Sequence, residues 1–410
     1  MSSSPFALKA RYVFPVSGPP LRDAAVTVDG QRIVGVGTPV AGCPLEDLGN
    51  IALLPGLVNA HAHLEYGELD APLGERGMAF PAWIRRVITW KREAGGPTAA
   101  AVERGLAESL RHGTTTLGEI ASPGWPRAPF AVAAQSCTVF LELIGLAKER
   151  IAERMVLARQ HLDLPSARWR AGLSPHAPYS VRFECLPEIV ALARRGEAPL
   201  AMHLAESLEE YQLLRSGGGS FRELLEDLGV WDESALPRRS RPLDYLQALA
   251  EAPRALVIHG NYLDAQEIQF LAAHARRMAV VYCPRTHDWF GHPRHPLPRL
   301  LAAGATVALG TDGRASNPDL SLLAEIRFVA ARFPELPPAD VLRLGTLGGA
   351  QALGRDREIG TLQAGKRADL AVVSLDDRDA ADPHDLLFDS TRPVAATMIR
   401  GQWAWRASGV

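Results

Sequence analysis

Four short segments, far apart in the sequence, end apolar runs with histidine or acidic residues of the kind that bind metal ions. These residues are His61, His63, His203, Glu206, His259 and Asp312. Imidazole nitrogens and carboxylate oxygens are common ligands of zinc and related divalent ions. Each apolar run has the length of a β-strand, and a parallel barrel gathers catalytic groups from distant parts of a chain at its strand ends. The pattern therefore predicts a metal-dependent hydrolase.

Taken one at a time, these segments are weak signals. His61 and His63 are two residues apart, so on a strand both side chains point to the same face. A pair of ordinary pocket histidines is equally consistent with that spacing. Glu206 follows His203 by three residues and suits proton transfer beside a metal, although it also fits the solvated start of a helix. His259 taken alone could be an ordinary core histidine, and Asp312 taken alone could be part of a tight turn. The metal interpretation therefore rests on the occurrence of all these residues together at strand ends.

One zinc family is excluded by the order of residues around a cysteine. The run His63-Leu64-Glu65 matches half of the signature of the cytidine-type zinc deaminases. The other half requires a proline followed by two spaced cysteines. Here Cys283 precedes Pro284 instead, so the chain is not predicted to belong to that family.

The composition argues against several kinds of partner and points to the cytoplasm. The 410 residues carry a formal net charge of -2, which gives no electrostatic reason to expect nucleic acid or an anionic membrane. Four cysteines without a CxxC pair favour a reducing compartment. Residues 1–10 lack a basic segment followed by an apolar core, and no run of about eighteen apolar residues occurs. We expect a cytoplasmic protein that acts on a small molecule and binds neither nucleic acid nor membrane.

The order of apolar runs predicts an α/β fold built on a TIM-type (β/α)8 barrel. Eight candidate strands alternate with helical stretches, which favours parallel pairing. These strands cover residues 51–59, 114–120, 137–144, 169–174, 200–204, 255–258, 279–283 and 306–310. Helices are expected at residues 98–112, 151–162, 187–195, 266–276, 320–333 and 339–353.

Both ends of the chain predict a second, smaller unit. Residues 8–54 and the segment after Asp369 contain short β-prone runs broken by tight turns. We expect a small β-sandwich domain formed by residues 1–54 and 365–410, with the barrel at residues 55–364.

Two long connections interrupt the regular spacing of the barrel. Residues 67–97 follow the first expected strand and carry Trp83 and Trp90, and residues 207–253 follow the fifth. Long connections at the active end of a barrel usually shape or cover a substrate pocket. The alternative is a solvated insertion without a role.

The chain resembles the amidohydrolase superfamily over nearly its whole length. The run from Pro55 to Leu64 is similar to the first-strand signature of the superfamily, and segments around His203, His259 and Asp312 follow in the expected order. The ending Gly365-Lys366-Arg367-Ala368-Asp369 is similar to the segment that returns such chains to a β-sandwich domain. The strongest likeness is to a branch of mononuclear deaminases and chlorohydrolases, which act on adenosine derivatives, aminofutalosine, guanine and triazines.

The resemblance implies roles for individual residues. It implies metal ligation by His61, His63, His203 and Asp312, and catalysis beside the metal by Glu206 and His259. His176, in a motif after the fourth strand, is implied to contact the substrate. Binuclear members bridge two metals with a modified lysine on that strand, and residues 169–176 contain no lysine, so one metal is expected. The resemblance also leaves a homodimer open, because relatives often pair.

Two departures from this branch bear on the substrate. Relatives that deaminate adenosine-type nucleosides often place a carboxylate before a tryptophan after the first strand, whereas the run here is Ala79-Phe80-Pro81-Ala82-Trp83. The loop after the seventh strand also departs from the usual Pro-x-Ser-Asn. Both changes argue against a simple nucleoside, and His63-Leu64-Glu65 is similar to a run in aminofutalosine deaminases. We take His176, Glu65 and Trp83 as candidate substrate contacts.

The expected reaction is hydrolytic deamination of an aminated heterocycle, nucleoside-like or purine- or pterin-like, by a metal-activated water. Asp312 and His259 are expected to orient this water, and Glu206 to carry its proton to a ring nitrogen. One divalent ion is expected, with zinc preferred over iron and manganese. Such an enzyme would hydrolyse carbon–nitrogen bonds in cyclic amidines. The alternatives are a chlorohydrolase or a cyclic amide hydrolase of the same superfamily and, remotely, a non-catalytic scaffold.

Overall fold

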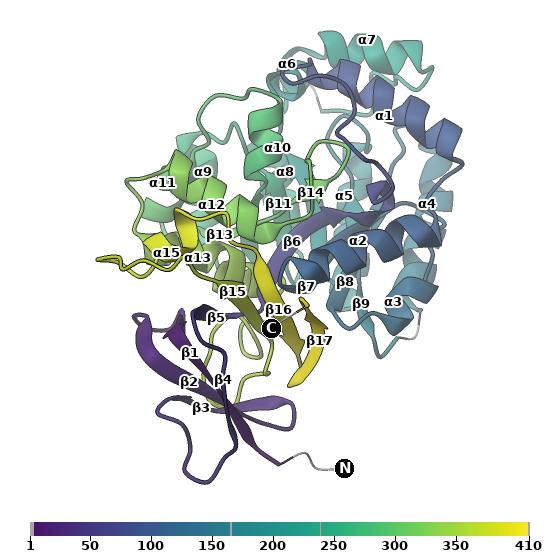
Figure 1. Cartoon of the computed structure of the whole chain (residues 1–410). Coiled ribbons are helices and arrows are strands. Elements are labelled where there is room, and N and C mark those ends of the chain that lie inside the picture. Colours follow the sequence, from purple (N-terminus) through teal and green to yellow (C-terminus); the bar gives the residue numbers. More distant parts are fainter. Residues whose placement is uncertain (1–3, 165, 238, 409–410) are drawn as a thin grey trace.

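The fold consists of a closed parallel barrel and a separate mixed sheet (Figure 1). A computed structural model describes residues 4–164, 166–237 and 239–408. The first and last parts of the chain lie together in the mixed sheet, at the lower end of the view in Figure 1, and the middle of the chain forms the barrel above it.

The barrel contains eight strand positions, one of which is interrupted. Its strands are β6 (Leu57–His63), β7 (Thr114–Ala121), β8 (Ser136–Leu143), β9 (Trp169–Pro175), β10 (Leu200–Leu204), β11 (Ala255–His259), β12 (Met278–Tyr282), β13 (Thr306–Leu309) and β14 (Asp312–Gly313). β13 pairs with β12 and β14 pairs with β6, both in parallel, so the sheet closes on itself. Only two residues separate β13 from β14. The predicted TIM-type barrel is therefore confirmed.

Asn59 holds the interruption in the eighth strand against the first strand. Its Nδ2 donates to Thr311 Oγ1 at 2.8 Å, and its Oδ1 accepts from the backbone N–H of Thr311 at 3.1 Å. Gly310 precedes this point and lies so near β6 that an added Cβ would meet His61 Cβ at 2.7 Å. These contacts join two parts of the chain about 250 residues apart and fix the position of the following residue, Asp312.

The mixed sheet draws its strands from both ends of the chain. It contains β1 (Phe6–Val13), β2 (Leu21–Asp29), β3 (Arg32–Gly37), β4 (Leu45–Asp47), β5 (Ile51–Pro55), β15 (Leu370–Ser374), β16 (Val394–Ile399) and β17 (Gln402–Arg406). β5 pairs with β15 and with β1, which joins the two ends. The exact domain limits, 1–54 with 365–410 and 55–364, stay predictions, and residues 1–3 and 409–410 lie outside the described part of the chain.

The expected first barrel strand at residues 51–59 was wrong in its extent. The apolar run is divided between β5, in the mixed sheet, and β6, in the barrel. Gly56 lies at the division, where an added Cβ would be 2.3 Å from Thr115 Oγ1. The chain leaves one sheet and enters the other within a single residue, and both halves are apolar because both are buried.

Helices cover the barrel and fill its long connections. They are α1 (Phe80–Ala94), α2 (Ala99–Arg111), α3 (Ala128–Val132), α4 (Ile151–Leu162), α5 (Leu186–Arg195), α6 (Leu208–Ser216), α7 (Ser220–Asp227), α8 (Pro242–Leu249), α9 (Ala265–Ala273), α10 (Pro284–Trp289), α11 (Leu297–Ala302), α12 (Leu322–Arg332), α13 (Pro338–Arg343), α14 (Gly349–Ala352) and α15 (Asp385–Phe388). Short 3-10 turns occur at Leu64–Tyr66, Lys148–Arg150 and Phe183–Cys185, and a π-helical turn at Leu344–Gly348 separates α13 from α14. The helix expected at residues 339–353 is therefore interrupted.

The two long connections are mainly helical. The first contains α1, and the second contains α6, α7 and α8. α1 ends where Gly95 takes a left-handed conformation, with φ of 75°. α1, α6 and α7 gather at the end of the barrel far from the mixed sheet, at the top of Figure 1. They therefore build the surroundings of whatever site that end contains.

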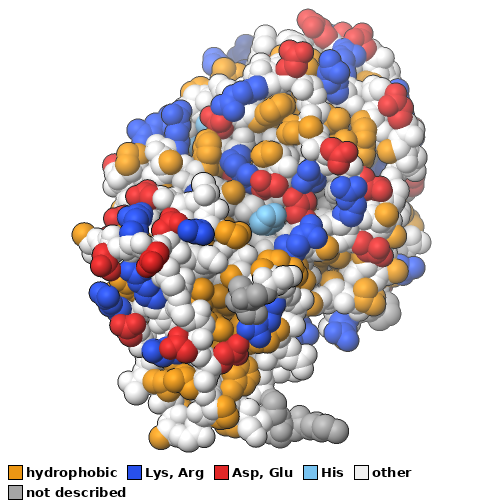
Figure 2. Space-filling view, viewed as in Figure 1, with side chains coloured by type: hydrophobic (Ala, Val, Ile, Leu, Met, Phe, Trp, Pro, Cys, Tyr) orange, Lys and Arg blue, Asp and Glu red, His pale blue; other side chains and the backbone are white. Residues whose placement is uncertain are grey.

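Charged side chains of both signs are spread over the visible surface, and the cysteines are unpaired. On the face shown in Figure 2, acidic and basic side chains are interspersed without a large area of one sign. None of the helices in the described part of the chain has the length and apolar character needed to span a bilayer. The four cysteines are free thiols, and three of them are buried.

Candidate metal centre and catalytic pocket

Three histidines and an aspartate converge at the carboxyl ends of the barrel strands. The Nε2 atoms of His63 and His203 are 3.4 Å apart. Asp312 Oδ1 lies 3.5 Å from His61 Nε2 and 3.7 Å from His63 Nε2. The four side chains come from β6, β10 and β14, and all are buried. The structure therefore brings together the four residues that the sequence analysis selected as metal ligands.

The hydrogen bonding of these histidines fits a metal ion. His61 is completely buried, and neither of its ring nitrogens has a hydrogen-bond partner among the described residues. Leaving such groups without a partner in a protein interior is unfavourable. His203 Nδ1 lies 3.0 Å from the carbonyl oxygen of His176, which orients the ring and leaves Nε2 free. A divalent cation would supply a partner for one nitrogen of each ring, so the donor set fits a metal site.

His259 is also close enough to count among the potential ligands. Ligand atoms of His61, His203 and His259 lie within 4.8 Å of one another, as do those of His61, His63 and Asp312. His259 Nε2, however, is 3.2 Å from Glu206 Oε1. This contact ties His259 to an acidic side chain, as expected for a group that acts beside the metal.

Three residues at the strand ends have an unusual backbone conformation. Ala205, His259 and Asp312 have φ values of 56°, 70° and 57°. Side chains other than glycine rarely adopt this left-handed region, and such strain is often found at functional sites. Each residue directly follows, ends or begins a barrel strand, so the chain turns sharply where Glu206, His259 and Asp312 enter the site.

Asp312 is held in its ionised form. Its Oδ1 accepts from the backbone N–H of Gly313 at 2.9 Å, and its Oδ2 accepts from Ser316 Oγ at 3.0 Å. Burial alone would raise the pKa of this carboxyl, but the His61 ring, 3.5 Å away, and the other nearby imidazoles hold the pKa below its usual range. Asp312 therefore offers a negative charge to a cation or a hydrogen-bond acceptor to water.

The surroundings of Glu206 raise the pKa of its carboxyl, whereas those of Asp312 lower it. Its carboxyl is buried, and burial first, then the charges of Asp312 and Glu210, raise its pKa well above the usual range. Burial conversely lowers the pKa of His63, His203 and His259, which keeps their imidazoles neutral. Neutral imidazoles can bind a metal, and a carboxyl with a raised pKa can carry a proton at neutral pH.

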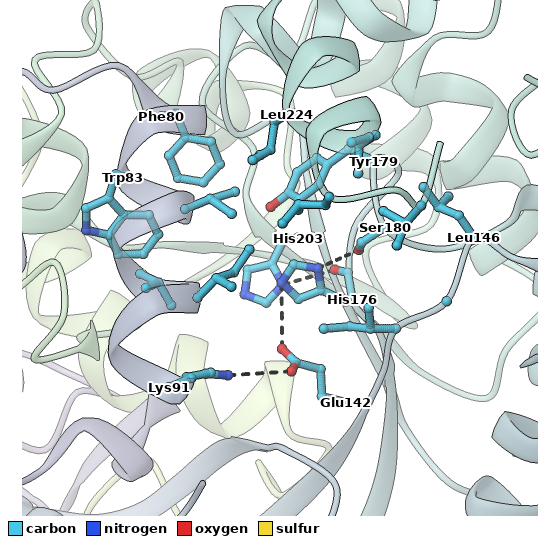
Figure 3. A pocket seen from close by; sticks show the side chains of 18 of the residues that line it. Phe80, Trp83, Lys91, Glu142, Leu146, His176, Tyr179, Ser180, His203 and Leu224 are labelled. Carbon is cyan, nitrogen blue, oxygen red and sulfur yellow. Dashed lines mark hydrogen bonds and ion pairs between the residues drawn. The ribbon is translucent and has the colours of Figure 1, made fainter. Parts of the chain in front are cut away.

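A large, mainly apolar pocket opens above these groups. It has a volume of about 620 Å³ and reaches His63, His203, Glu206, His259 and Asp312 at its base. Its walls come from both long connections: Phe80, Trp83, Ile84, Val87, Leu224 and Leu228. Figure 3 shows Phe80 and Trp83 on one side of the pocket and Tyr179 and Leu224 across from them. The helical connections thus shape the pocket, as predicted.

Two of the three candidate substrate contacts line this pocket. Trp83 lies in its wall, with Nε1 donating to the carbonyl of Ala315 at 3.2 Å. His176 lies near the base, its Nδ1 2.6 Å from Ser180 Oγ. Glu65 is different: it does not line the pocket and instead lies 2.8 Å from Lys91 Nζ. Its carboxylate is buried behind the wall because the chain turns into a 3-10 helix after His63.

The sequence analysis missed several residues of the site. Lys91, Glu142, Tyr179 and Ser316 line the pocket, and Glu210 bonds the backbone of Glu206. Glu142 had a recognisable signal, because it is a lone acid inside the apolar run that became β8. Lys91 lies on α1, within a connection that carried no motif, so only the folded structure brings it to Glu142.

Comparisons with known proteins identify the family and the fold. A sequence model of the amidohydrolase family matches residues 52–404. A 5-methylthioadenosine/S-adenosylhomocysteine deaminase from Halobacterium salinarum is 30% identical over 387 residues, which cover 88% of this chain and 82% of the relative. The crystal structure of aminofutalosine deaminase from Helicobacter pylori with methylthio-coformycin gives a TM-score of 0.85 at 22% identity, covering 98% of this chain and 100% of that chain. A zinc-bound adenosine deaminase from Xanthomonas campestris gives 0.77 at 27% identity, covering 97% and 92%.

Proposed function

The chain belongs to the amidohydrolase family, and we propose that it is a metal-dependent deaminase of an adenosine-type compound. The observation that carries this proposal is the meeting of His61, His63, His203 and Asp312 beside the Glu206–His259 pair at the base of one pocket. Such an enzyme hydrolyses a carbon–nitrogen bond in a cyclic amidine and releases ammonia.

A single divalent metal would be held by His61, His63, His203 and Asp312. When bound, it supplies a Lewis acid that lowers the pKa of water from near 16 towards about 7. Three imidazoles and a carboxylate suit zinc, and the zinc in the adenosine deaminase from Xanthomonas campestris supports that choice. Iron and manganese accept the same donors.

The chain's own residues supply orientation and proton transfer. Asp312, fixed by Gly313 and Ser316, accepts a hydrogen bond from the attacking water, and His259 helps to orient it. Glu206 takes a proton from this water and delivers it to the ring nitrogen next to the carbon that carries the amino group. The oxygen of this water bonds to that carbon, its second proton reaches the amino group, and the carbon–nitrogen bond breaks to release ammonia. General acid–base catalysis of this kind contributes about 10²–10⁴-fold in rate.

The substrate class rests on the relatives and on the pocket. Relatives named as deaminases of 5-methylthioadenosine, S-adenosylhomocysteine or adenosine are similar along most of this chain. The pocket of about 620 Å³ has room for a heterocycle with a substituent. We assign His176 to the heterocycle and Trp83 to the apolar wall around the substituent.

Two finer expectations accompany this proposal. Free thiols and near-neutral net charge agree with a cytoplasmic location. A homodimer remains an expectation from the family likeness, and the molar mass in solution, measured by light scattering, would test it.

The direct test is an assay of ammonia and chloride release after loading the protein with zinc. The panel contains adenosine, 5′-methylthioadenosine, S-adenosylhomocysteine, guanine and a chlorinated triazine. We expect ammonia from at least one adenosine-type compound. Chloride release alone would assign the site to dehalogenation, and the absence of both products from the metal-loaded protein would contradict the proposed function.

A further inference from the structure

Two charged side chains of opposite sign lie near each other in the mainly apolar wall of the pocket, which Arg92, Arg150 and Arg154 also line. Lys91 comes from α1 and Glu142 from the end of β8, and both line the pocket (Figure 3). Neither belongs to the candidate metal ligands or to the Glu206–His259 pair. Charged groups in an apolar wall are unfavourable unless they have partners.

Glu142 has no partner at an ordinary hydrogen-bond distance among the described residues. Its carboxylate is 3.5 Å from Ser122 Oγ, 3.6 Å from His176 Nε2 and 4.0 Å from Lys91 Nζ. Hydrogen bonds to a carboxylate are normally 2.5–3.2 Å long. Only 5% of the side chain is exposed, so bulk water does not replace these partners. Glu142 is thus a buried hydrogen-bond acceptor that faces the pocket, and its carboxylate oxygens have no short hydrogen bond within the described structure.

The positive charge of Lys91 is paired mainly with Glu65 and not with Glu142. Its Nζ lies 2.8 Å from Glu65 Oε1 and 3.1 Å from Ser122 Oγ, and it sits 5.5 Å from the centre of the Tyr66 ring. Glu65, which does not line the pocket, therefore takes the closest ion pair. Lys91 holds Glu142 from 4.0 Å away without neutralising it by direct contact.

The position of Glu142 indicates which part of a substrate it meets. It approaches His176, whose Nδ1 is already paired with Ser180 Oγ. The His176 ring lies next to His203, with their centres 4.9 Å apart. The polar contacts of Glu142 in the described structure are with Ser122, His176 and Lys91, none of which is a candidate metal ligand. A substrate with its reacting carbon at the metal centre keeps its amino group there, so Glu142 would meet a more distant part of the substrate.

We infer that Glu142, held beside Lys91, accepts hydrogen bonds from hydroxyl groups on the substituent of the heterocycle and thereby determines substrate specificity. This inference rests on the proposed function, because the sugar of an adenosine-type compound would supply those hydroxyls. A site built to bond a donor rejects an analogue that lacks it, since the buried acceptor is then left without a partner. Glu142 is the specificity residue, and Lys91 positions it.

The test compares matched substrates in matched variants. The probes are adenosine and 5′-methylthioadenosine, each paired with its 2′,3′-dideoxy counterpart, and kcat and KM are measured for the wild type and for Glu142→Gln. A hydrogen bond to a charged group corresponds to a preference of about tenfold to a hundredfold in kcat/KM for the hydroxylated probe. Glu142→Gln should reduce that preference at least about fivefold, mainly through KM, because a charged hydrogen bond is roughly twice as strong as a neutral one.

Glu188→Gln is the control variant. It makes the same change at an exposed carboxylate that pairs with Arg159 at 3.0 Å and does not line the pocket, so it should affect both members of each probe pair alike. Metal content and thermal midpoint are measured for each variant, to separate loss of folding from loss of recognition.

The outcomes separate this inference from the proposed function. If the wild type releases no ammonia from any probe, the proposed function fails, and the inference fails with it. If ammonia is released but the wild type treats hydroxylated and dideoxy probes within about twofold of each other, only the inference is overturned, whether or not Glu142→Gln folds. An equal loss on both members of each pair in Glu142→Gln also overturns it. A reduced preference in Glu142→Gln but not in Glu188→Gln supports it.

Discussion

The carboxylate of Glu210 accepts a hydrogen bond from the backbone N–H of Glu206, 3.0 Å away, and both side chains are buried. The other oxygen of Glu210 accepts from the N–H of Ala205 at 2.8 Å, where φ is 56°. Asn261 Nδ2 donates to the carbonyl of Glu206 at 2.9 Å. The backbone that carries Glu206 is thus fixed from both sides in a conformation that alanine rarely adopts.

Glu210→Gln should therefore impair catalysis without touching the metal site. An amide has one acceptor oxygen where the carboxylate has two, so one backbone N–H loses its partner and the turn that aims Glu206 loosens. We expect kcat to fall about tenfold to a hundredfold, the range associated with small misplacements of a reacting group. Metal content should be unchanged. A kcat near the wild-type value would show that the turn holds without Glu210.

Glu206→Gln should keep its metal and lose turnover. The side chain has the same shape, but its amide cannot carry a proton, so we expect kcat to fall at least about a hundredfold. Steady-state kinetics and elemental analysis of one purified sample check both halves of this prediction. Retention of more than about a tenth of the activity would remove Glu206 from the proton-transfer step.

His61→Ala should reduce the metal content of the purified protein well below that of the wild type. His61 is completely buried and both its ring nitrogens lack hydrogen-bond partners in the described structure, so its removal takes away a ligand without breaking a hydrogen bond of the ring. His274→Ala is a matched control, since that histidine directly follows α9, is half-buried and lies with Nδ1 2.8 Å from the carbonyl oxygen of Phe270. Equal metal content in the two variants would contradict the assignment of His61.

Acid should destabilise the fold through histidines that are buried in their neutral form. Burial lowers the pKa of His176 to about 3 and that of His295 to about 3. The same side chains in the unfolded chain titrate near 6.5, so below that pH the unfolded chain binds protons that the folded chain does not. The free energy of unfolding should therefore be highest above about pH 6.5 and should fall as the pH drops towards about 3.

Denaturant unfolding of the metal-free protein between pH 7 and pH 4 checks this dependence. His295→Gln should show a shallower fall with pH than the wild type, because one such histidine is missing. His295 is a suitable choice because it is 2% exposed and stacks on Tyr282, outside the candidate ligand set. Parallel profiles for the two proteins would contradict the prediction.

Much of the fold was predictable from local patterns in the sequence. The alternation of apolar runs with helical stretches gave the parallel barrel, and β-prone runs at both ends gave the mixed sheet. The division between β5 and β6 was not predictable, because residues 51–59 form one apolar run while their partners lie elsewhere in the chain: β5 pairs with β15 and β6 with β7. An apolar run indicates burial, but the partner strand depends on the whole fold.

Some residues of the candidate site were also predictable from the sequence, and others were not. His61, His203, His259 and Asp312 could be selected because strand ends of a parallel barrel meet at one face, and the structure brings them together. Glu65 was expected in the pocket because it follows that motif, yet its side chain pairs with Lys91 behind the wall. Its orientation depends on a short turn and on a lysine from another element, which spacing along the chain does not reveal.

The hydrogen bond between Asn59 and Thr311 has a consequence for metal affinity. β14, the last barrel strand in the sequence, both closes the sheet against β6 and carries Asp312. A chain in which β14 is detached from β6 would therefore lack the aspartate among its candidate ligands. Closure of the barrel and completion of the ligand set depend on the same strand pair.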